Sequence, residues 1–186
     1  MIQIRFHGRG GQGVVTAAEL TALAAFNDGH YAQAFPSFGV ERSGAPIQAF
    51  ARIADTPIIT REQISQPDIL IIQDASLLEN KDVLAGISAR TKLIINSDKN
   101  AAAISALIGN KIKPENITAS AATEIALRLL GKNIVNTVIL GAFARATGLV
   151  TMPSLLAAIA QKFDGKSQDI IQKNHAAITA AYNYAS

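Results

Sequence analysis

The sequence predicts an α/β protein of three layers, α/β/α, built on a mixed, mainly parallel Rossmann-like sheet with a helical C-terminal third. Two observations indicate this class. Short apolar runs typical of strands alternate with helical patterns over the first two thirds of the chain, and helical patterns alone fill the rest. In addition, the first strand pattern leads through a glycine-rich turn directly into a helix, an order that open α/β sheets use at their ligand-binding edge.

Composition limits the possible classes. The 186 residues are 49% hydrophobic and 17% charged, which is typical of a globular chain and suits one domain over residues 1–186. There is no cysteine, so the chain forms no disulfide and binds no iron–sulfur cluster through its own thiolates. The net charge of +3 favours an anionic ligand or an acidic partner, but no Lys/Arg cluster reaches the density typical of nucleic-acid-binding proteins.

The same features favour a soluble, cytoplasmic protein. The first residues form a strand pattern followed by glycines, not a basic segment leading into an apolar one, so we expect no signal peptide. No uninterrupted apolar run approaches the roughly 20 residues that a membrane span requires. The absence of cysteine fits a reducing compartment.

The N-terminal part predicts a strand, a helix and a pair of strands. Strict alternation of apolar and polar residues predicts a half-buried strand over Ile2–Phe6. Helical spacing of leucines and alanines predicts a helix over Val14–Phe26. Strands are predicted at Tyr31–Phe35 and Ile47–Ile53, and no helical pattern separates them. Because a parallel crossover usually needs a helix, this pair is expected to be antiparallel.

The remaining elements follow from similar patterns. The segment Thr60–Gln63 matches a capping box and predicts a short helix that ends near Pro67. Apolar runs predict central strands at Asp68–Ile72 and Lys92–Asn96, and a weaker run predicts another at Asn116–Ala119. Helices bounded by glycines or prolines are predicted at Ala121–Leu130, Asn136–Thr147, Ser154–Lys162 and Gln168–Tyr184.

The glycine loop after the first strand carries the strongest chemical signal. Gly8, Gly10 and Gly13 satisfy the pattern G-x-G-x-x-G between a predicted strand and a predicted helix. Glycines let backbone N–H groups approach a phosphate, and the following helix presents its positive end to the same anion. Arg9 and Gln12 can add side-chain donors. The predicted ligand-binding residues are therefore Gly8, Arg9, Gly10, Gly11, Gln12 and Gly13; the alternative is a tight turn with no ligand.

The rest of the dinucleotide pattern is incomplete. A Rossmann site normally places an acidic residue at the end of the second strand, roughly 20 residues after the glycines. Here the strand ends at residues 35–37 without an acid, whereas Asp28 precedes the strand and Glu41 lies well into the next loop. The missing acid disfavours NAD and favours another phosphate-bearing ligand.

A second glycine-containing loop spans Pro36–Pro46. It holds the charged pair Glu41 and Arg42, and an arginine offers a fork of donors to phosphate or carboxylate. Because the flanking strands are expected to lie side by side, the two loops are predicted to line one cleft at the end of the sheet. This loop adds Glu41, Arg42, Ser43 and Gly44 to the predicted site; the alternative is a surface loop with solvated or paired charges.

Other polar residues carry weaker signals. No pattern of a catalytic triad is present, and the three histidines lack metal-ligand spacing. His7, beside the glycine loop, is predicted to be a hydrogen-bonded residue at a strand end; the alternative is a functional side chain. Asp74 is predicted to face the cleft or to cap the next helix. Three residues on one side of the last helix are predicted to pack into the core: Ile170, Ile171 and Ile178.

Three stretches together resemble a known family. They are Ile4–Gly13 with Val15–Ala18, Ala32–Pro46, and the later stretch Asn136–Phe143. These residues are similar to the gamma subunits of 2-oxoacid:ferredoxin oxidoreductases. Within that family the most similar branch is the pyruvate enzyme, pyruvate synthase, and the resemblance spans essentially the whole chain.

The resemblance implies a role inside a larger enzyme that decarboxylates a 2-oxoacid, forms an acyl-CoA reversibly and passes electrons to ferredoxin or flavodoxin. In this family alpha and beta subunits hold thiamine diphosphate, and a cysteine-rich delta subunit or its fused equivalent holds iron–sulfur clusters. The gamma portion is associated with coenzyme A. The implied partners are thus alpha, beta and delta subunits, with no nucleic acid, no membrane, no metal and no catalytic residue on this chain.

Three hypotheses stay open from the sequence. The first is the gamma subunit of a pyruvate:ferredoxin oxidoreductase that contributes to coenzyme A binding. The second is a stand-alone nucleotide-dependent oxidoreductase, which the glycine loop alone favours and the missing acid disfavours. The third is a purely structural subunit whose glycine loops serve packing.

Overall fold

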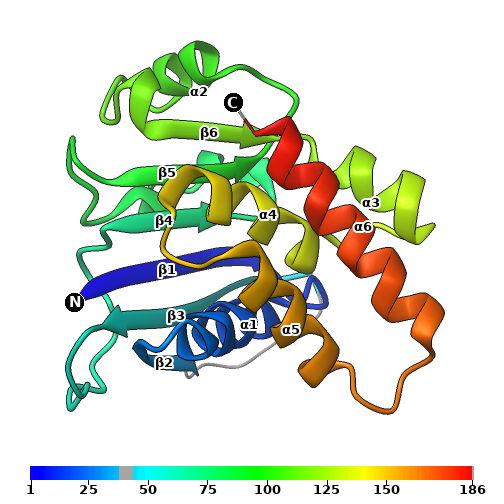
Figure 1. Ribbon diagram of the computed structural model, residues 1–186. Helices are drawn as coiled ribbons and strands as arrows, with labels where there is room; N and C mark the ends of the chain where they lie inside the picture. The colour runs from blue at the N-terminus through cyan, green and yellow to red at the C-terminus, as the bar shows by residue number, and fades with distance from the viewer. Residues whose placement is uncertain (38–43, 186) are drawn as a thin grey trace.

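A six-stranded sheet organises the computed structural model, which describes residues 1–37 and 44–185 (Figure 1). The strand order is β2-β3-β1-β4-β5-β6. In chain order the strands are β1 (Ile2–Arg9), β2 (Tyr31–Pro36), β3 (Pro46–Ala54), β4 (Ile69–Ile72), β5 (Lys92–Asn96) and β6 (Ile117–Ser120).

The sheet is mixed and mainly parallel. β1, β4, β5 and β6 run parallel to one another, and β3 runs antiparallel to both β1 and β2. The predicted antiparallel pair is therefore confirmed, and its short connection without a helix is the physical reason. β1 lies at the centre, where Phe6 pairs with Ala49 of β3 on one side and with Ile71 of β4 on the other.

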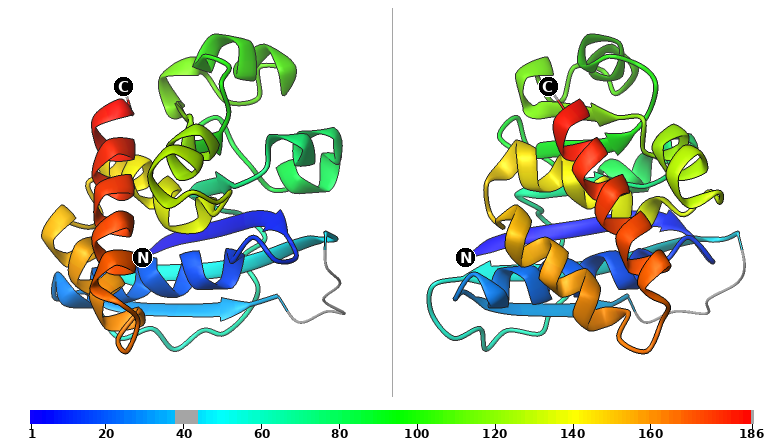
Figure 2. Two further views of the ribbon diagram at one scale, coloured as in Figure 1. Left: turned by 90° about the vertical axis from the view of Figure 1, so that its right-hand side faces the viewer. Right: turned by 45° about the vertical axis from the view of Figure 1, so that its right-hand side comes forward.

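Helices cover both faces of the sheet, unequally. The left view of Figure 2 shows α6 and the 3-10 helices that follow β4 on opposite sides of the sheet. One layer contains α1 (Val14–Asn27), α3 (Ala122–Leu130), α4 (Val135–Thr147), α5 (Met152–Lys162) and α6 (Gln168–Tyr184). The other layer is thinner and contains η1 (Ala75–Glu79), η2 (Lys81–Leu84) and α2 (Ala101–Leu107), with η3 (Pro114–Asn116) preceding β6. None of the helices in the described ranges is long and apolar enough to cross a membrane.

Each central strand contributes side chains to two hydrophobic clusters, because successive side chains point to opposite faces of the sheet. In β4, Ile69 and Ile71 join the cluster under the five long helices, whereas Leu70 and Ile72 join the cluster under η1, η2 and α2. All four side chains are buried. This explains why the strand is a continuous apolar run.

The first strand corrects one prediction. The expectation of a half-buried β1 is wrong, because Arg5 and His7 are only 4% and 2% exposed. The Arg5 guanidinium donates hydrogen bonds at 2.6–3.4 Å to four backbone carbonyls, those of Ile64, Ser65, Val83 and Ala85. A buried polar group needs such partners. Here they come from segments 59 to 80 residues away, which local alternation cannot reveal.

The short helix predicted to begin with the capping box at Thr60–Gln63 and to end near Pro67 is also wrong. Residues 57–64 form no helix, although Ile64 is buried. The carbonyl of Glu62 accepts a hydrogen bond from buried Arg52, and the carbonyl of Ile64 accepts one from Arg5. A helix would direct these carbonyls to its own N–H groups. A helix this short is marginal without other support, so the two arginines keep the segment open.

The other predicted strands and helices are confirmed within two residues at each end, and β1 itself continues to Arg9. No sequence pattern predicted α2. Its N-terminus is capped by Asn100, whose side chain accepts a hydrogen bond from the Ala103 amide at 2.9 Å. An Asn before an alanine run is the local signal that could have revealed it.

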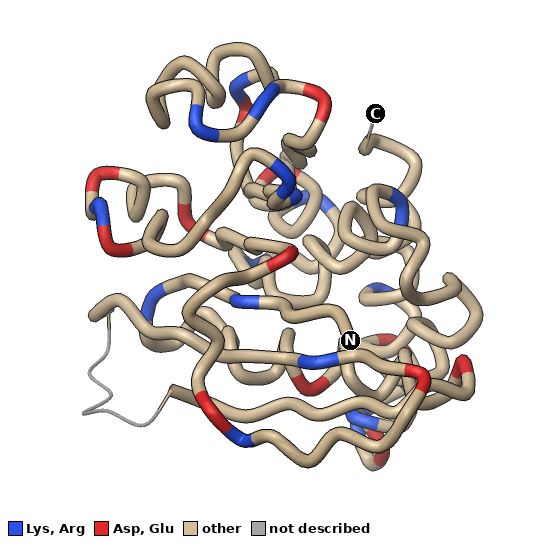
Figure 3. The backbone as a smooth tube through the Cα atoms, turned by 90° about the vertical axis from the view of Figure 1, so that its left-hand side faces the viewer, with Lys and Arg blue, Asp and Glu red and all other residues tan. Residues whose placement is uncertain are grey.

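Figure 3 shows Lys and Arg interspersed with Asp and Glu along the described chain.

Candidate functional site

The glycine loop lies at the carboxyl ends of the adjacent parallel strands β1 and β4. Because β1 extends to Arg9, Gly8 and Arg9 are strand residues, and the turn itself is Gly10–Gly13. After β1 the chain enters α1 on one face, and after β4 it enters η1 on the other face. Open α/β sheets bind ligands at such a switch point, so the loop is at the expected edge.

Two glycines of the turn have backbone conformations that L-residues rarely adopt. Gly11 has φ +92° and Gly13 has φ +68°. A Cβ on Gly13 would collide with the side-chain amide of Asn136, at the start of α4. A Cβ on Gly11 would meet no atom within 4 Å. Gly13 is therefore required by both turn and packing, whereas Gly11 borders open space.

The second predicted loop meets the first. The amide of Gly10 donates to the carbonyl of Ala45 at 2.8 Å, and the amide of Gly44 donates to the carbonyl of Gly10 at 3.1 Å. Adjacent pairing of β1 with β3 brings these segments together. Three predicted site residues, Glu41, Arg42 and Ser43, lie outside the described residues.

Polar side chains tie the glycine loop to the end of β4. Arg9 Nε lies 3.0 Å from Asp74 Oδ2, and Gln12 Nε2 donates to the same oxygen at 3.1 Å. The other Asp74 oxygen accepts from the amide of Ser76, so Asp74 caps η1 as predicted. Burial by itself raises the pKa of Asp74. Hydrogen bonds from Ser76 and Gln12 and the positive charge of Arg9 lower this pKa by more than burial raises it. The net pKa therefore lies below the ordinary value, and the carboxylate stays ionised.

Some backbone N–H groups of the glycine loop already have acceptors inside the chain. The amide of Arg9 donates to Gln12 Oε1 at 2.7 Å, and the amide of Gln12 donates to the carbonyl of Arg9 at 3.0 Å. By contrast, the N-cap of α1 is Gly13, which has no side chain that could accept a hydrogen bond from the first turn of the helix. The first N–H groups of a helix have no intrahelical acceptor. The N–H groups of the first turn of α1 are thus available to an anion.

Several polar atoms in or directly after strands β1, β4 and β6 are buried without partners. His7 Nε2, both polar side-chain atoms of Gln73 and Ser120 Oγ have no hydrogen-bond partner among the described residues. The ring of His7 thus has no partner at Nε2 among the described residues, whereas the His7 carbonyl accepts from the Gln73 amide at 2.8 Å. Burial, and then the charge of Arg5, lower the pKa of His7 to about 3, so the imidazole is neutral.

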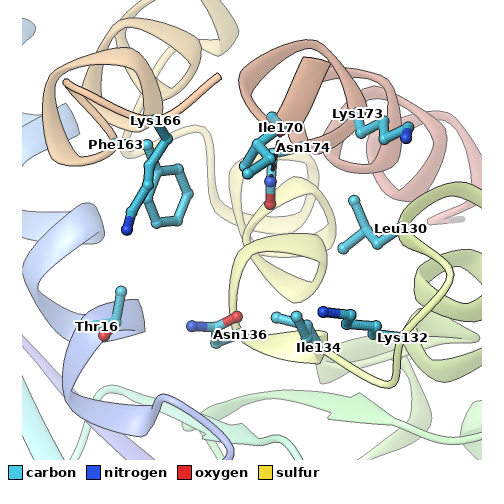
Figure 4. A pocket seen from close by; sticks show the side chains of 10 residues that line it. All are labelled: Thr16, Leu130, Lys132, Ile134, Asn136, Phe163, Lys166, Ile170, Lys173 and Asn174. Atoms are coloured by element: carbon cyan, nitrogen blue, oxygen red, sulfur yellow. Dashed lines mark hydrogen bonds between the residues drawn. The ribbon is translucent and has the colours of Figure 1, made fainter. Parts of the chain in front are cut away.

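A cavity of about 390 Å³ lies beside the start of α1 (Figure 4). No sequence pattern predicted this cavity, because its walls come from three segments far apart in the chain, at residues 16, 130–136 and 163–174. Ile170, predicted to be a core residue, is 42% exposed and lines this cavity, whereas Ile171 and Ile178 are buried. The lining residues are Thr16, Leu130, Lys132, Ile134, Asn136, Phe163, Lys166, Ile170, Lys173 and Asn174.

Comparison with known proteins decides the family. The sequence pattern of pyruvate ferredoxin/flavodoxin oxidoreductase matches residues 3–184. The chain belongs to this family. The resemblance found in the motifs of the sequence is thereby confirmed.

Individual members of the pyruvate ferredoxin/flavodoxin oxidoreductase family match along almost their full length. The pyruvate/ketoisovalerate oxidoreductases common subunit gamma of Thermococcus kodakarensis is 49% identical over 98% of this chain and 96% of its own. The crystal structure of the pyruvate oxidoreductase subunit PORC from Thermotoga maritima is 34% identical, with a TM-score of 0.86 over 100% of this chain and 97% of its own. The predicted α/β fold is thus the fold of that family member.

A more distant structure shares the fold alone. It is 2-oxoglutarate:ferredoxin oxidoreductase from Magnetococcus marinus, determined with 2-oxoglutarate, coenzyme A and succinyl-CoA bound. It is 17% identical, with a TM-score of 0.76, and the match covers 98% of this chain and 30% of that longer one. In the described part of the present chain, no group of three or more His, Asp or Glu side chains is placed to hold a metal ion.

Proposed function

We propose that this chain is the gamma subunit of a multi-subunit pyruvate (2-oxoacid):ferredoxin oxidoreductase, in which it forms one domain and contributes to coenzyme A binding and assembly. The observation that carries the subunit role is the 49% identity, over 98% of the chain, to a relative named as a gamma subunit. That relative is named as common to pyruvate and ketoisovalerate oxidoreductases. A gamma subunit that is common to enzymes for two different 2-oxoacids supports the proposal that other subunits select the 2-oxoacid.

The geometry at the start of α1 supports coenzyme A as the ligand. Coenzyme A carries phosphates, and the first turn of α1 presents N–H donors without a side-chain cap. Gly11 borders open space at the same edge of the sheet. In this proposal Gly11, Gly13 and Arg42 contact the phosphate-bearing part, while Arg9 and Gln12 shape the turn through Asp74. When bound, the coenzyme supplies the thiol that accepts the acyl group.

The remaining chemistry belongs to partner subunits in this proposal. The chain has no cysteine to hold an iron–sulfur cluster. The clusters that reduce ferredoxin or flavodoxin are therefore assigned to a delta subunit or its fused equivalent. Thiamine diphosphate is assigned to alpha and beta subunits, as the family resemblance implies.

The test uses the assembled complex and two variants, Gly11→Ala and Arg42→Ala. A Cβ on Gly11 enters only open space, so it obstructs a ligand without striking the protein. Loss of a charge-assisted hydrogen bond costs about 1.5–3 kcal/mol, or roughly one to two decades in affinity. Each variant is expected to raise the apparent KM for coenzyme A and to leave decarboxylation of the 2-oxoacid intact.

Gly109→Ala is the matched control, because Gly109 also has a positive φ and open space around its Cβ. It should share the backbone strain of Gly11→Ala without the change in KM. Unchanged coenzyme A dependence in correctly assembled variants would reject the coenzyme A role and leave a purely structural subunit. Sustained turnover of pyruvate by the isolated chain would reject the subunit role and favour a stand-alone enzyme.

A further inference from the structure

The connection between β3 and β4 contains a segment without secondary structure, residues 55–63, which we call the strap. None of its N–H groups donates a hydrogen bond to a backbone acceptor in the described part of the chain. Every strap residue is exposed or half-buried, and Ile59 is 91% exposed. A segment with so few buried contacts and no backbone hydrogen bonds of its own belongs to the least stable parts of a fold.

Both ends of the strap are fixed to the sheet. At its start, Ala54 is the last residue of β3, and the carboxylate of Asp55 lies 3.0 Å from His30 Nδ1. At its end, the side chain of Ile64 is 2% exposed, and the Ile64 carbonyl accepts a hydrogen bond from Arg5 at 3.4 Å. The strap is therefore a free-running segment between two anchored points.

Two side-chain contacts hold the second half of the strap against the sheet. Arg52 Nη2 of β3 donates to the carbonyl of Glu62. Gln63 Nε2 donates to Ser37 Oγ at 3.4 Å, an exposed and long hydrogen bond. Arg52 is only 2% exposed, and a hydrogen bond from a charged, buried donor stabilises more than an exposed neutral one. The Arg52 guanidinium is thus the main attachment of the strap.

The Arg52 side chain is also held by β2, independently of the strap. Its guanidinium lies over the ring of Phe35 at 5.1 Å, and Nη1 donates to Gln33 Oε1 at 3.4 Å. No carboxylate forms an ion pair with Arg52 in the described ranges, and its Nε is buried without a partner there. The guanidinium therefore stays in position when the strap leaves.

Hydration of this guanidinium favours release of the strap. A charged group that is buried without a carboxylate pays for the loss of its water. Burial accordingly lowers the pKa of Arg52, more than the nearby charge of Glu62 raises it. Water that enters beneath the strap hydrates the guanidinium and so offsets part of the hydrogen bond that is lost.

We propose that the strap detaches from the sheet as a unit while all six strands stay paired, and that Arg52 is its latch. Detachment breaks the contact of Gln63 with Ser37, the first residue after β2, which lies in the second glycine-containing loop of the candidate site. The strap is thus a conformational device connected to that loop. The inference goes beyond the proposed function, since it rests on contacts within the chain.

The test is limited proteolysis of the full-length chain with trypsin, followed at the bond after Arg61. Cleavage requires release of the strap, because the residue after this bond is Glu62, whose carbonyl Arg52 binds. In the wild type, the cleavage rate is expected to rise only slightly with urea below the unfolding transition, because detachment exposes little surface. Arg52→Gln should accelerate this cleavage about ten-fold or more, the effect of losing a charge-assisted hydrogen bond.

Two controls separate the latch from general destabilisation. Arg145→Gln removes another arginine that lies over an aromatic ring, that of Tyr182 at 5.6 Å, and should leave cleavage after Arg61 unchanged. In Arg52→Gln, cleavage after Arg90, in an exposed loop before β5, should proceed at the wild-type rate.

Three results would overturn the inference. The first is a wild-type cleavage rate after Arg61 that depends on urea as steeply as global unfolding, since the strap would then leave only when the sheet unfolds. The second is an Arg52→Gln variant that is cleaved after Arg61 at the wild-type rate. The third is equal acceleration after Arg61 and Arg90, which would show a loss of overall stability. If Arg52→Gln does not fold, the urea dependence of the wild type decides alone.

Discussion

Arg9 and Asp74 are 65 residues apart in the chain, yet the Arg9 Nε lies 3.0 Å from the Asp74 carboxylate. Gln12 donates to the same carboxylate oxygen, at 3.1 Å. Both polar side chains of the glycine loop therefore bind the end of β4. Because these contacts lie within the chain, the shape of the turn is set before any ligand arrives.

Replacement of this carboxylate tests the network. Asp74→Asn is expected to lower the free energy of unfolding by about 1 kcal/mol at neutral pH, because the contacts from Arg9 and Gln12 lose their charge assistance. The folded-state pKa of Asp74 lies below its ordinary value. Its contribution is therefore present above the unfolded-state pKa and is lost as pH falls through the folded-state pKa. Urea denaturation at neutral and acidic pH measures this change.

Asp98→Asn is the control for that experiment. Asp98 is exposed, and its side chain forms no hydrogen bond or ion pair with the described residues. This variant should match the wild type throughout. A deficit of Asp74→Asn that persists undiminished in acid would contradict the assignment of its effect to the charged carboxylate.

Packing at the start of α1 gives a steric prediction. Gly13 and Gly131 have nearly equal φ values, +68° and +69°, but only a Cβ on Gly13 would strike Asn136. Gly131→Ala should cost the backbone strain alone, about 1–2 kcal/mol. Gly13→Ala should cost distinctly more, measured as the free energy of unfolding. In a double-mutant cycle, Asn136→Ala should recover the excess; equal costs for the two glycines would show that the contact is not tight.

The contact of α4 with α6 predicts a reversal of the usual glycine effect. Alanine in place of a helical glycine normally stabilises by about 0.5–1 kcal/mol. At Gly141 the added Cβ would collide with the backbone oxygen of Ile178 and lie 2.8 Å from the amide nitrogen of Tyr182. Gly141→Ala is therefore expected to destabilise by about 1–3 kcal/mol in thermal and urea unfolding. Ala176→Gly, at an exposed position of α6, calibrates ordinary propensity at about 1 kcal/mol; a stabilised Gly141→Ala would refute close packing.

The buried imidazole of His7 predicts acid sensitivity. Its folded-state pKa of about 3 lies below the ordinary value of 6.5. Between these values the unfolded chain binds the additional proton, so stability falls as pH decreases, by up to about 1.4 kcal/mol per pH unit. His7→Gln should reduce the slope of unfolding free energy against pH in that window. Comparison at pH above the ordinary value gives the cost of the substitution itself, and an unchanged slope would exclude His7 as the titrating group.

Much of the fold could be predicted because local preferences and tertiary requirements agree. The apolar run of β4 predicts burial on both faces, and both faces are covered. The short connection between β2 and β3 predicts antiparallel pairing, which the register confirms. Where the two disagree, the local pattern fails: Thr60–Gln63 has the residues of a capping box, but buried arginines bind the carbonyls of the segment.

The sequence by itself determined the strand–glycine–helix order, the absence of thiol chemistry and the family, because these depend on residue identity and on neighbours within a few positions. Only the tertiary structure decided that Arg5 is buried and that Asp74 holds Arg9. It also brought Lys132 and Lys166 to one cavity. The physical reason is that desolvation and hydrogen bonding act between atoms close in space, and these partners are 34 to 80 residues apart in the chain.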